Sequence, residues 1–140
     1  MTTFKTFKRY DAATAEEGVF FKIEDEIGNE YGEFKCRYLD PHSPKTDVLM
    51  KRIRQRHADE IRSKKMGDMD AVRAVFVEGV LMDWKGVLDV NDKPVPFTLA
   101  NAIAFFNLED NRWLLNELSV LAGDVKNFQA QAAIEEVEKN

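Results

Sequence analysis

Two short segments near the start of the chain alternate between apolar and polar positions, which is typical of β-strands with one buried face. Their apolar members are Val19, Phe21, Ile23, Phe34, Cys36 and Tyr38. Gly28-Asn29 lies between the two segments and is a turn signal. We therefore predict a β-hairpin in which residues 18–24 pair with residues 31–38. Because two strands alone are marginal in water, the hairpin must pack its apolar face on helices.

Helical spacing begins after the prolines at positions 41 and 44. The first predicted helix covers residues 46–65, where Leu49, Ile53, His57 and Ile61 recur every four residues on an otherwise charged surface. A second helix is predicted over residues 69–85, with Asp68 as its N-cap. This second helix is apolar on nearly every side, so it must lie inside the protein or against a partner.

Two further helices are predicted in the second half of the chain. Thr98 is expected to cap a short one that contains Phe105 and Phe106, and Asp110 is expected to cap the last one. The last helix has an apolar seam spaced like that of a coiled coil, formed by Leu114, Leu118, Leu121, Val125 and Phe128. The intervening loop, residues 87–95, is expected to form a short ribbon around Asn91-Asp92.

Together these elements predict an α+β fold that is mainly α, with an N-terminal β-hairpin packed on a bundle of about four helices. A chain of 140 residues suits one globular domain, here residues 1–128, of which residues 1–15 form a loosely held arm. Residues 129–140 are expected to be a disordered acidic tail. The segment 71–102 is expected to build the scaffold, with the contact surface elsewhere. The expected structural anchors are Phe76, Trp84, Phe97 and Leu118.

Composition favours a globular protein of the cytoplasm. The chain is 44% hydrophobic and 32% charged, which excludes wholesale disorder. No apolar run approaches the roughly 20 residues of a membrane span, and no secretory signal is visible at the start. The single cysteine, Cys36, has no partner for an internal disulfide, which fits a reducing compartment.

No arrangement of residues indicates an enzyme, a metal site or a cofactor. Cys36, His42 and His57 are too few and too scattered for a zinc site, so we interpret His57 as a structural histidine and Cys36 as a buried thiol. Residues 89–93 resemble the start of a calcium loop, but its later glycine and glutamate are missing. The serines lack a nucleophile elbow, and the glycines form no phosphate loop.

The net charge of −5 conceals a basic middle, because residues 45–73 carry a net charge of +4. The candidate partner-binding residues in this region are Lys51, Arg52, Arg54, Arg56 and Arg62. One interpretation is a small nucleic-acid-associated regulator that uses the basic helix 51–65. The pI near 5.1 makes nucleic acid the less favoured partner, and interleaved stacking aromatics are missing. A protein partner is the preferred interpretation.

A set of short motifs in a fixed order resembles the tail assembly chaperones of long-tailed, siphovirus-type bacteriophages. The resemblance covers about residues 12–128. The motifs are Gly18-Val19-Phe20-Phe21, Gly32-Glu33-Phe34-Lys35-Cys36, Phe76-Val77-Glu78, Asp83-Trp84-Lys85-Gly86-Val87, Pro96-Phe97-Thr98 and Asn101-Ala102.

This resemblance implies a non-catalytic assembly factor. Members of that family bind the helical tape measure protein, keep it soluble and help recruit the major tail protein. They act in the host cytoplasm and are absent from the mature virion. Many self-associate, and many have a second, longer form made by ribosomal frameshifting. The resemblance thus implies both protein partners, and it allows a homo-oligomer and a frameshifted form.

Overall fold

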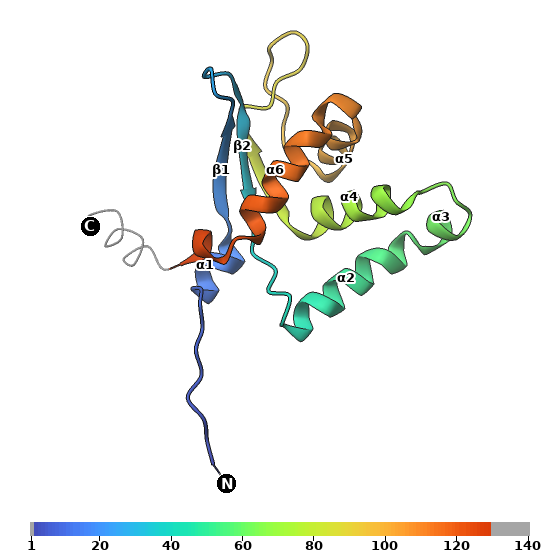
Figure 1. The fold of residues 1–140 in the computed structure, drawn as a ribbon. Coiled ribbons are helices and arrows are strands. Elements are labelled where there is room, and N and C mark those ends of the chain that lie inside the picture. The colour runs from blue at the N-terminus through green and yellow to red at the C-terminus, as the bar shows by residue number, and fades with distance from the viewer. Residues whose placement is uncertain (1, 130–140) are drawn as a thin grey trace.

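A three-stranded sheet with helices packed on one face forms the body of the molecule (Figure 1). The computed structural model describes residues 2–129. Figure 1 shows α6 (Arg112–Gly123) crossing the sheet, while α2 (Pro44–Arg56), α3 (Ala58–Arg62) and α4 (Asp68–Gly79) extend to one side as a helical hairpin. The prediction of an α+β, mainly helical fold is confirmed. None of the helices in this part of the chain is long and apolar enough to cross a membrane.

The sheet contains one more strand than the sequence predicted. Strands β1 (Val19–Glu24) and β2 (Glu30–Cys36) pair antiparallel as the expected hairpin, with Phe21 opposite Phe34. β3 (Leu81–Lys85) pairs antiparallel with the other edge of β2 and places Trp84 opposite Phe34.

The single helix predicted over residues 69–85 is therefore wrong beyond Gly79. Helix α4 ends there, and the chain continues as a strand whose register shifts opposite Lys35 and Cys36. Leu81 and Trp84 are buried in the core, whereas Asp83 and Lys85 are exposed. Pairing with β2 provides hydrogen-bond partners for the backbone N–H and C=O groups of this segment. This pairing outweighs the helical spacing of the apolar residues in the segment.

The core lies between the inner face of the sheet, the helices α5 (Leu99–Asn107) and α6, and the 3-10 turn η2 (Val125–Phe128). Phe34, Phe106, Leu118 and Phe128 are fully buried. Three predicted anchors, Phe76, Trp84 and Leu118, are also buried, and the fourth, Phe97, is half-buried.

Trp84 connects β3 to the loop that follows it. Its indole Nε1–H donates a hydrogen bond to the Val95 carbonyl at 2.8 Å, and the ring of Phe97 lies 5.3 Å away in an edge-to-face arrangement. The predicted ribbon is present in this loop, because the Val95 N–H donates to the Val87 carbonyl and the Asp89 N–H to the Lys93 carbonyl.

The predicted helix caps have mixed outcomes. The Thr98 hydroxyl accepts a hydrogen bond from the Asn101 N–H at 3.0 Å and caps α5, as predicted. Asp68 is instead the first residue of α4, whose cap is Gly67. Asp110 lies inside the 3-10 turn η1 (Glu109–Asn111), and α6 begins only at Arg112. The N-cap position of α6 is occupied by Asn111, whose side-chain amide donates a hydrogen bond to the Phe105 carbonyl. Asp110 is therefore not the cap of α6.

The predicted arm, residues 1–15, is partly ordered. Residues 2–9 form neither helix nor strand and are exposed, but Ala12–Glu17 forms the helix α1, capped by Asp11. The Asp11 N–H also donates to the Phe128 carbonyl, which ties α1 to the body. Of the tail predicted over residues 129–140, all but Gln129 lies outside the described residues.

Candidate functional site

The helical hairpin carries the candidate site, and it contains a break that the sequence did not predict. The helix expected over residues 46–65 is interrupted at His57, which ends α2 and precedes α3. His57 has φ −106° and ψ 10°, outside the helical region, and its ring turns toward α4. Its Nε2 lies 3.1 Å from Oε1 of Glu78. This contact links the end of α2 to α4, which supports the interpretation of His57 as a structural histidine.

Close packing joins the rest of α2 to α4. Ile53 is fully buried on this seam, and a Cβ atom at Gly79 would lie only 3.2 Å from its Cδ1. A side chain at position 79 would therefore require Ile53 to shift by a few tenths of an ångström in this close-packed seam. Arg73, also nearly buried on α4, pairs with Asp70 and donates from Nε to the Asn107 side chain of α5. These contacts hold the hairpin on the body.

An apolar depression of about 380 Å³ opens on one side of the hairpin. Its lining consists of Met50 and Arg54 from α2, Ile61 from α3, and Asp68, Ala71, Val72 and Val75 from α4. Val72 remains 53% exposed and the adjacent Met69 is 64% exposed. The depression thus presents apolar side chains to solvent, with one cation and one carboxylate at its margin.

Helix α4 therefore buries only part of its apolar surface. Phe76 and Val77 face the core, while Val72 and Met69 face outward. A helix that is apolar on nearly every side must be buried in the protein or covered by a partner. Helix α4 is buried against the core on one side only, so its other apolar side is available to a partner. The scaffold segment predicted from the sequence thus contributes to the candidate contact surface as well.

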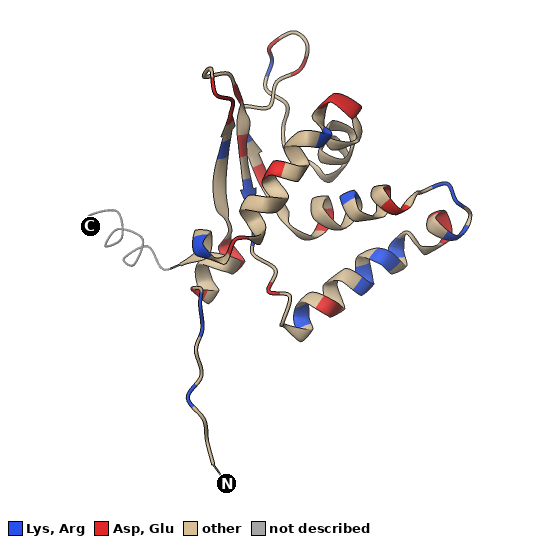
Figure 2. Ribbon diagram, in the orientation of Figure 1, with Lys and Arg blue, Asp and Glu red and all other residues tan. Residues whose placement is uncertain are grey.

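One of the predicted partner-binding residues, Arg54, lies at this depression, and the other four are not among its lining residues. Lys51, Arg52, Arg54 and Arg56 are all exposed on α2, which Figure 2 shows as a mostly basic helix. Arg54 lines the depression directly. Arg62 lies on α3, beyond the break, and its guanidinium is 3.6 Å from the Asp59 carboxylate.

The described residues offer little for covalent or metal chemistry. No group of three or more His, Cys, Asp or Glu side chains among residues 2–129 is arranged to hold a metal ion. Burial raises the pKa of the Cys36 thiol to about 12, so it stays protonated and is a poor nucleophile at neutral pH.

Comparison with known proteins assigns the chain to a family. The family model described as YdaY prophage protein matches residues 42–140. The chain belongs to the YdaY prophage protein family. It is thus a phage-related protein. No curated protein matches the chain, and no solved structure does.

The YdaY family match includes the whole helical hairpin but not β1 or β2. Within the hairpin, sequence reasoning found the basic residues of α2 and missed the apolar ones beside them. The missed lining residues are Ile61, Ala71, Val72 and Val75. The four-residue spacing of Ile53, His57 and Ile61 suggested one continuous stripe facing the core. The break at His57 instead leaves Ile61 beside the open depression.

Proposed function

We propose that this phage-related protein is a tail assembly chaperone, which binds the tape measure protein and helps recruit the major tail protein without catalysing a reaction. The observation that carries the proposal is the apolar depression between α2, α3 and α4, which has Arg54 in its lining, with further exposed basic side chains elsewhere on α2. Membership of a prophage family supports a role in the phage life cycle.

The depression has the properties required to hold a helical client. An amphipathic helix binds a groove by placing apolar side chains from successive turns on an apolar floor. Val72 and Val75 provide such a floor, and the flexible Met50 side chain can adapt to clients of different shape. Lys51 and Arg54 are positioned to meet acidic residues at the edge of such a helix.

Co-expression with the tape measure protein of the same phage tests the proposal. We expect the full chain to increase the soluble tape measure protein and to co-purify with it. Val72→Asp should reduce the recovered complex at least tenfold, because it places a carboxylate on the apolar floor. Val120→Asp is the matched control, since Val120 is 73% exposed on α6, away from the depression, and should leave recovery unchanged.

Two results would refute the proposal. One is a recovery of soluble tape measure protein no better than with an unrelated soluble domain. The other is an equal recovery with the two valine variants, both shown by thermal denaturation to be folded. Co-purification of the major tail protein with the chaperone tests the recruiting role in the same preparation.

The exposure of Lys51, Arg52, Arg54 and Arg56 on one helix favours a second candidate, a nucleic-acid-associated regulator. Such a protein binds duplex DNA, and the logarithm of its binding constant falls linearly with the logarithm of the salt concentration. Binding that is negligible even at low salt eliminates this candidate. Val72→Asp separates the two functions, because it should impair client binding and leave phosphate contacts intact.

A further inference from the structure

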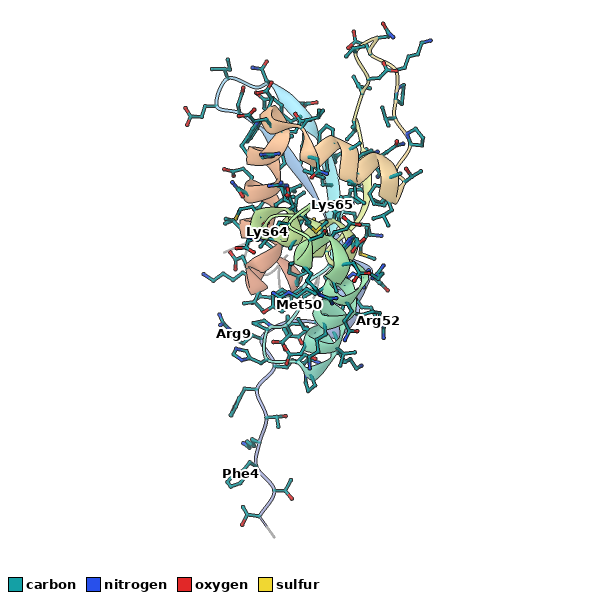
Figure 3. The ribbon with its side chains drawn as sticks, turned by 90° about the vertical axis from the view of Figure 1, so that its right-hand side faces the viewer. Phe4, Arg9, Met50, Arg52, Lys64 and Lys65 are labelled. Atoms are coloured by element: carbon teal, nitrogen blue, oxygen red, sulfur yellow. The ribbon has the colours of Figure 1, made fainter. Side chains whose placement is uncertain are left out.

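The N-terminal segment, residues 2–9, forms an arm that extends away from the body (Figures 1 and 3). Figure 3 shows Phe4 far out on this arm and Arg9 close to its root. Phe4 is 80% exposed and Phe7 is 87% exposed. The charged residues of the arm, Lys5, Lys8 and Arg9, are all basic. Two exposed phenylalanines on a cationic segment form a surface that the described part of the chain leaves without apolar cover.

The root of the arm is firmly attached, so the point at which the arm leaves the body is fixed. The Tyr10 hydroxyl donates to the Asp40 carboxylate at 2.8 Å, and the rings of Tyr10 and Tyr38 lie edge to face with centroids 5.0 Å apart. The next residue, Asp11, donates its N–H to the Phe128 carbonyl. The arm is thereby directed outward from the α1 end of the sheet.

The opposite end of the sheet carries a complementary surface. A depression of about 470 Å³ lies where the β1–β2 turn meets the start of α6. The charged residues that line it, within the described part of the chain, are all acidic: Glu24, Asp25, Glu26 and Glu117. Its apolar side is formed by Ile27, which is 85% exposed, and Trp113, which is 42% exposed.

This acidic depression is rigid before any ligand binds. Asp25 organises the turn by accepting hydrogen bonds from the backbone N–H groups of Ile27 and Asn29. It also accepts one from the Tyr31 hydroxyl at 2.8 Å, and the Tyr31 ring packs edge to face on Trp113 with centroids 4.9 Å apart. A preorganised site loses less conformational entropy on binding.

We propose that residues 2–9 of one copy bind in the acidic depression of a second copy. In a left-handed extended conformation with three residues per turn, Phe4 and Phe7 lie on the same side and can cover Ile27 and Trp113. Lys5 and Lys8 then lie on a second side and Arg9 on the third, so basic side chains flank the phenylalanines and can meet the four acidic residues of the depression.

A second copy is the occupant because of where the two surfaces lie. The arm leaves from the α1 end of the sheet and points away from it, while the acidic depression lies at the far end, beside the β1–β2 turn (Figure 1). To reach its own depression, the arm must reverse and run along the whole sheet. A neighbouring copy is reached without reversal. Such a contact is head-to-tail, so it produces a ring if it closes and a filament if it does not. This inference does not rest on the proposed function.

Sedimentation and light scattering of the full chain, over a range of protein and salt concentrations, test the proposal. We expect association that grows with protein concentration and weakens with salt. Lys5→Glu with Arg9→Glu, and separately Glu24→Lys with Glu117→Lys, should each weaken association at least tenfold. An equal mixture of these two variants should restore it, because each reversed surface then meets its reversed partner.

Lys64→Glu with Lys65→Glu is the control for the change in net charge. These exposed lysines lie in the α3–α4 loop, distant from both surfaces, and should leave association unchanged (Figure 3). A full chain that stays monomeric at low salt overturns the proposal. So does association that the arm variant leaves unaltered, or a mixture that fails to restore it. Val72→Asp should associate normally, so failure of client binding and failure of self-association are distinguishable.

Discussion

Replacing Trp84 tests whether β3 and the loop behind it depend on one buried ring. Trp84 is 6% exposed, and its ring contacts the rings of Phe34, Phe97 and Phe105 in edge-to-face arrangements. Its Nε1–H also binds the Val95 carbonyl at 2.8 Å. The substitution Trp84→Ala removes all of these interactions at once.

The expected loss follows from the size of the ring. Truncating a buried tryptophan to alanine typically lowers the free energy of unfolding by about 3–5 kcal/mol. Trp84→Phe keeps most of the ring contacts and removes the hydrogen bond, so it should cost about 1–2 kcal/mol. Trp113→Ala is the matched control: Trp113 is 42% exposed and packs on Tyr31, which predicts a loss of about 1 kcal/mol.

Urea denaturation of the three variants and the unchanged chain measures these losses, from the unfolding midpoints and slopes. A loss for Trp84→Ala below about 1 kcal/mol, or no larger than that for Trp113→Ala, would refute the role of Trp84 as an anchor. If Trp84→Ala does not fold, Trp84→Phe still provides a measurable value. No loss for Trp84→Phe would show that the hydrogen bond to Val95 contributes nothing.

Three further predictions concern other parts of the sheet. Hydrogen bonds, chiefly from the Tyr31 hydroxyl, lower the pKa of Asp25 from its usual 3.8 to about 2. The ionised Asp25 carboxylate therefore stabilises the fold above about pH 4, and this contribution is lost as the pH falls toward 2. Tyr31→Phe should raise that pKa in an NMR titration, and an unchanged pKa would contradict the assignment. Gly18→Ala should cost about 1–3 kcal/mol in urea unfolding, because Gly18 has φ +86° and a Cβ there would lie 3.0 Å from the Cys36 carbonyl oxygen. Gly123→Ala, where the added Cβ meets nothing within 4 Å, should be neutral or stabilising by up to about 1 kcal/mol. The buried Cys36 should react with a thiol reagent at pH 8 only after denaturation, and rapid labelling of the folded chain would contradict its burial.

The β1–β2 hairpin, the Thr98 cap and the cores of α5 and α6 were predictable because their signals are local. Alternation around Phe34, the Thr98 cap and the seam through Leu118 each depend on residues close in sequence. β3 was not predictable in this way. Leu81 continues the apolar spacing of α4, and only the unpaired edge of β2, distant in sequence, makes a strand the better state. The β-branched Val80 and the aromatic Trp84 were the available local signals.

The candidate site was only half predictable for a similar reason. Exposed basic side chains on α2 could be identified from charge alone. The apolar depression depends on tertiary structure, because Val72 and Ile61 look like core residues until the break at His57 and the direction of α4 are known. A spacing of four residues shows which side chains share a helix face, but not whether that face is covered.

The attachment of the helical hairpin also has a consequence for its dynamics. Helix α2 packs mainly on α4, whereas α4 also packs on α5 and β3. Proteins open in cooperative units, and those with few neighbours open at a lower free energy. The amides of α2 should therefore exchange with solvent faster than those of β2, by separation of α2 from α4 while the sheet stays folded. A client bound across both helices would oppose that separation, so slower amide exchange in α2 would report its binding.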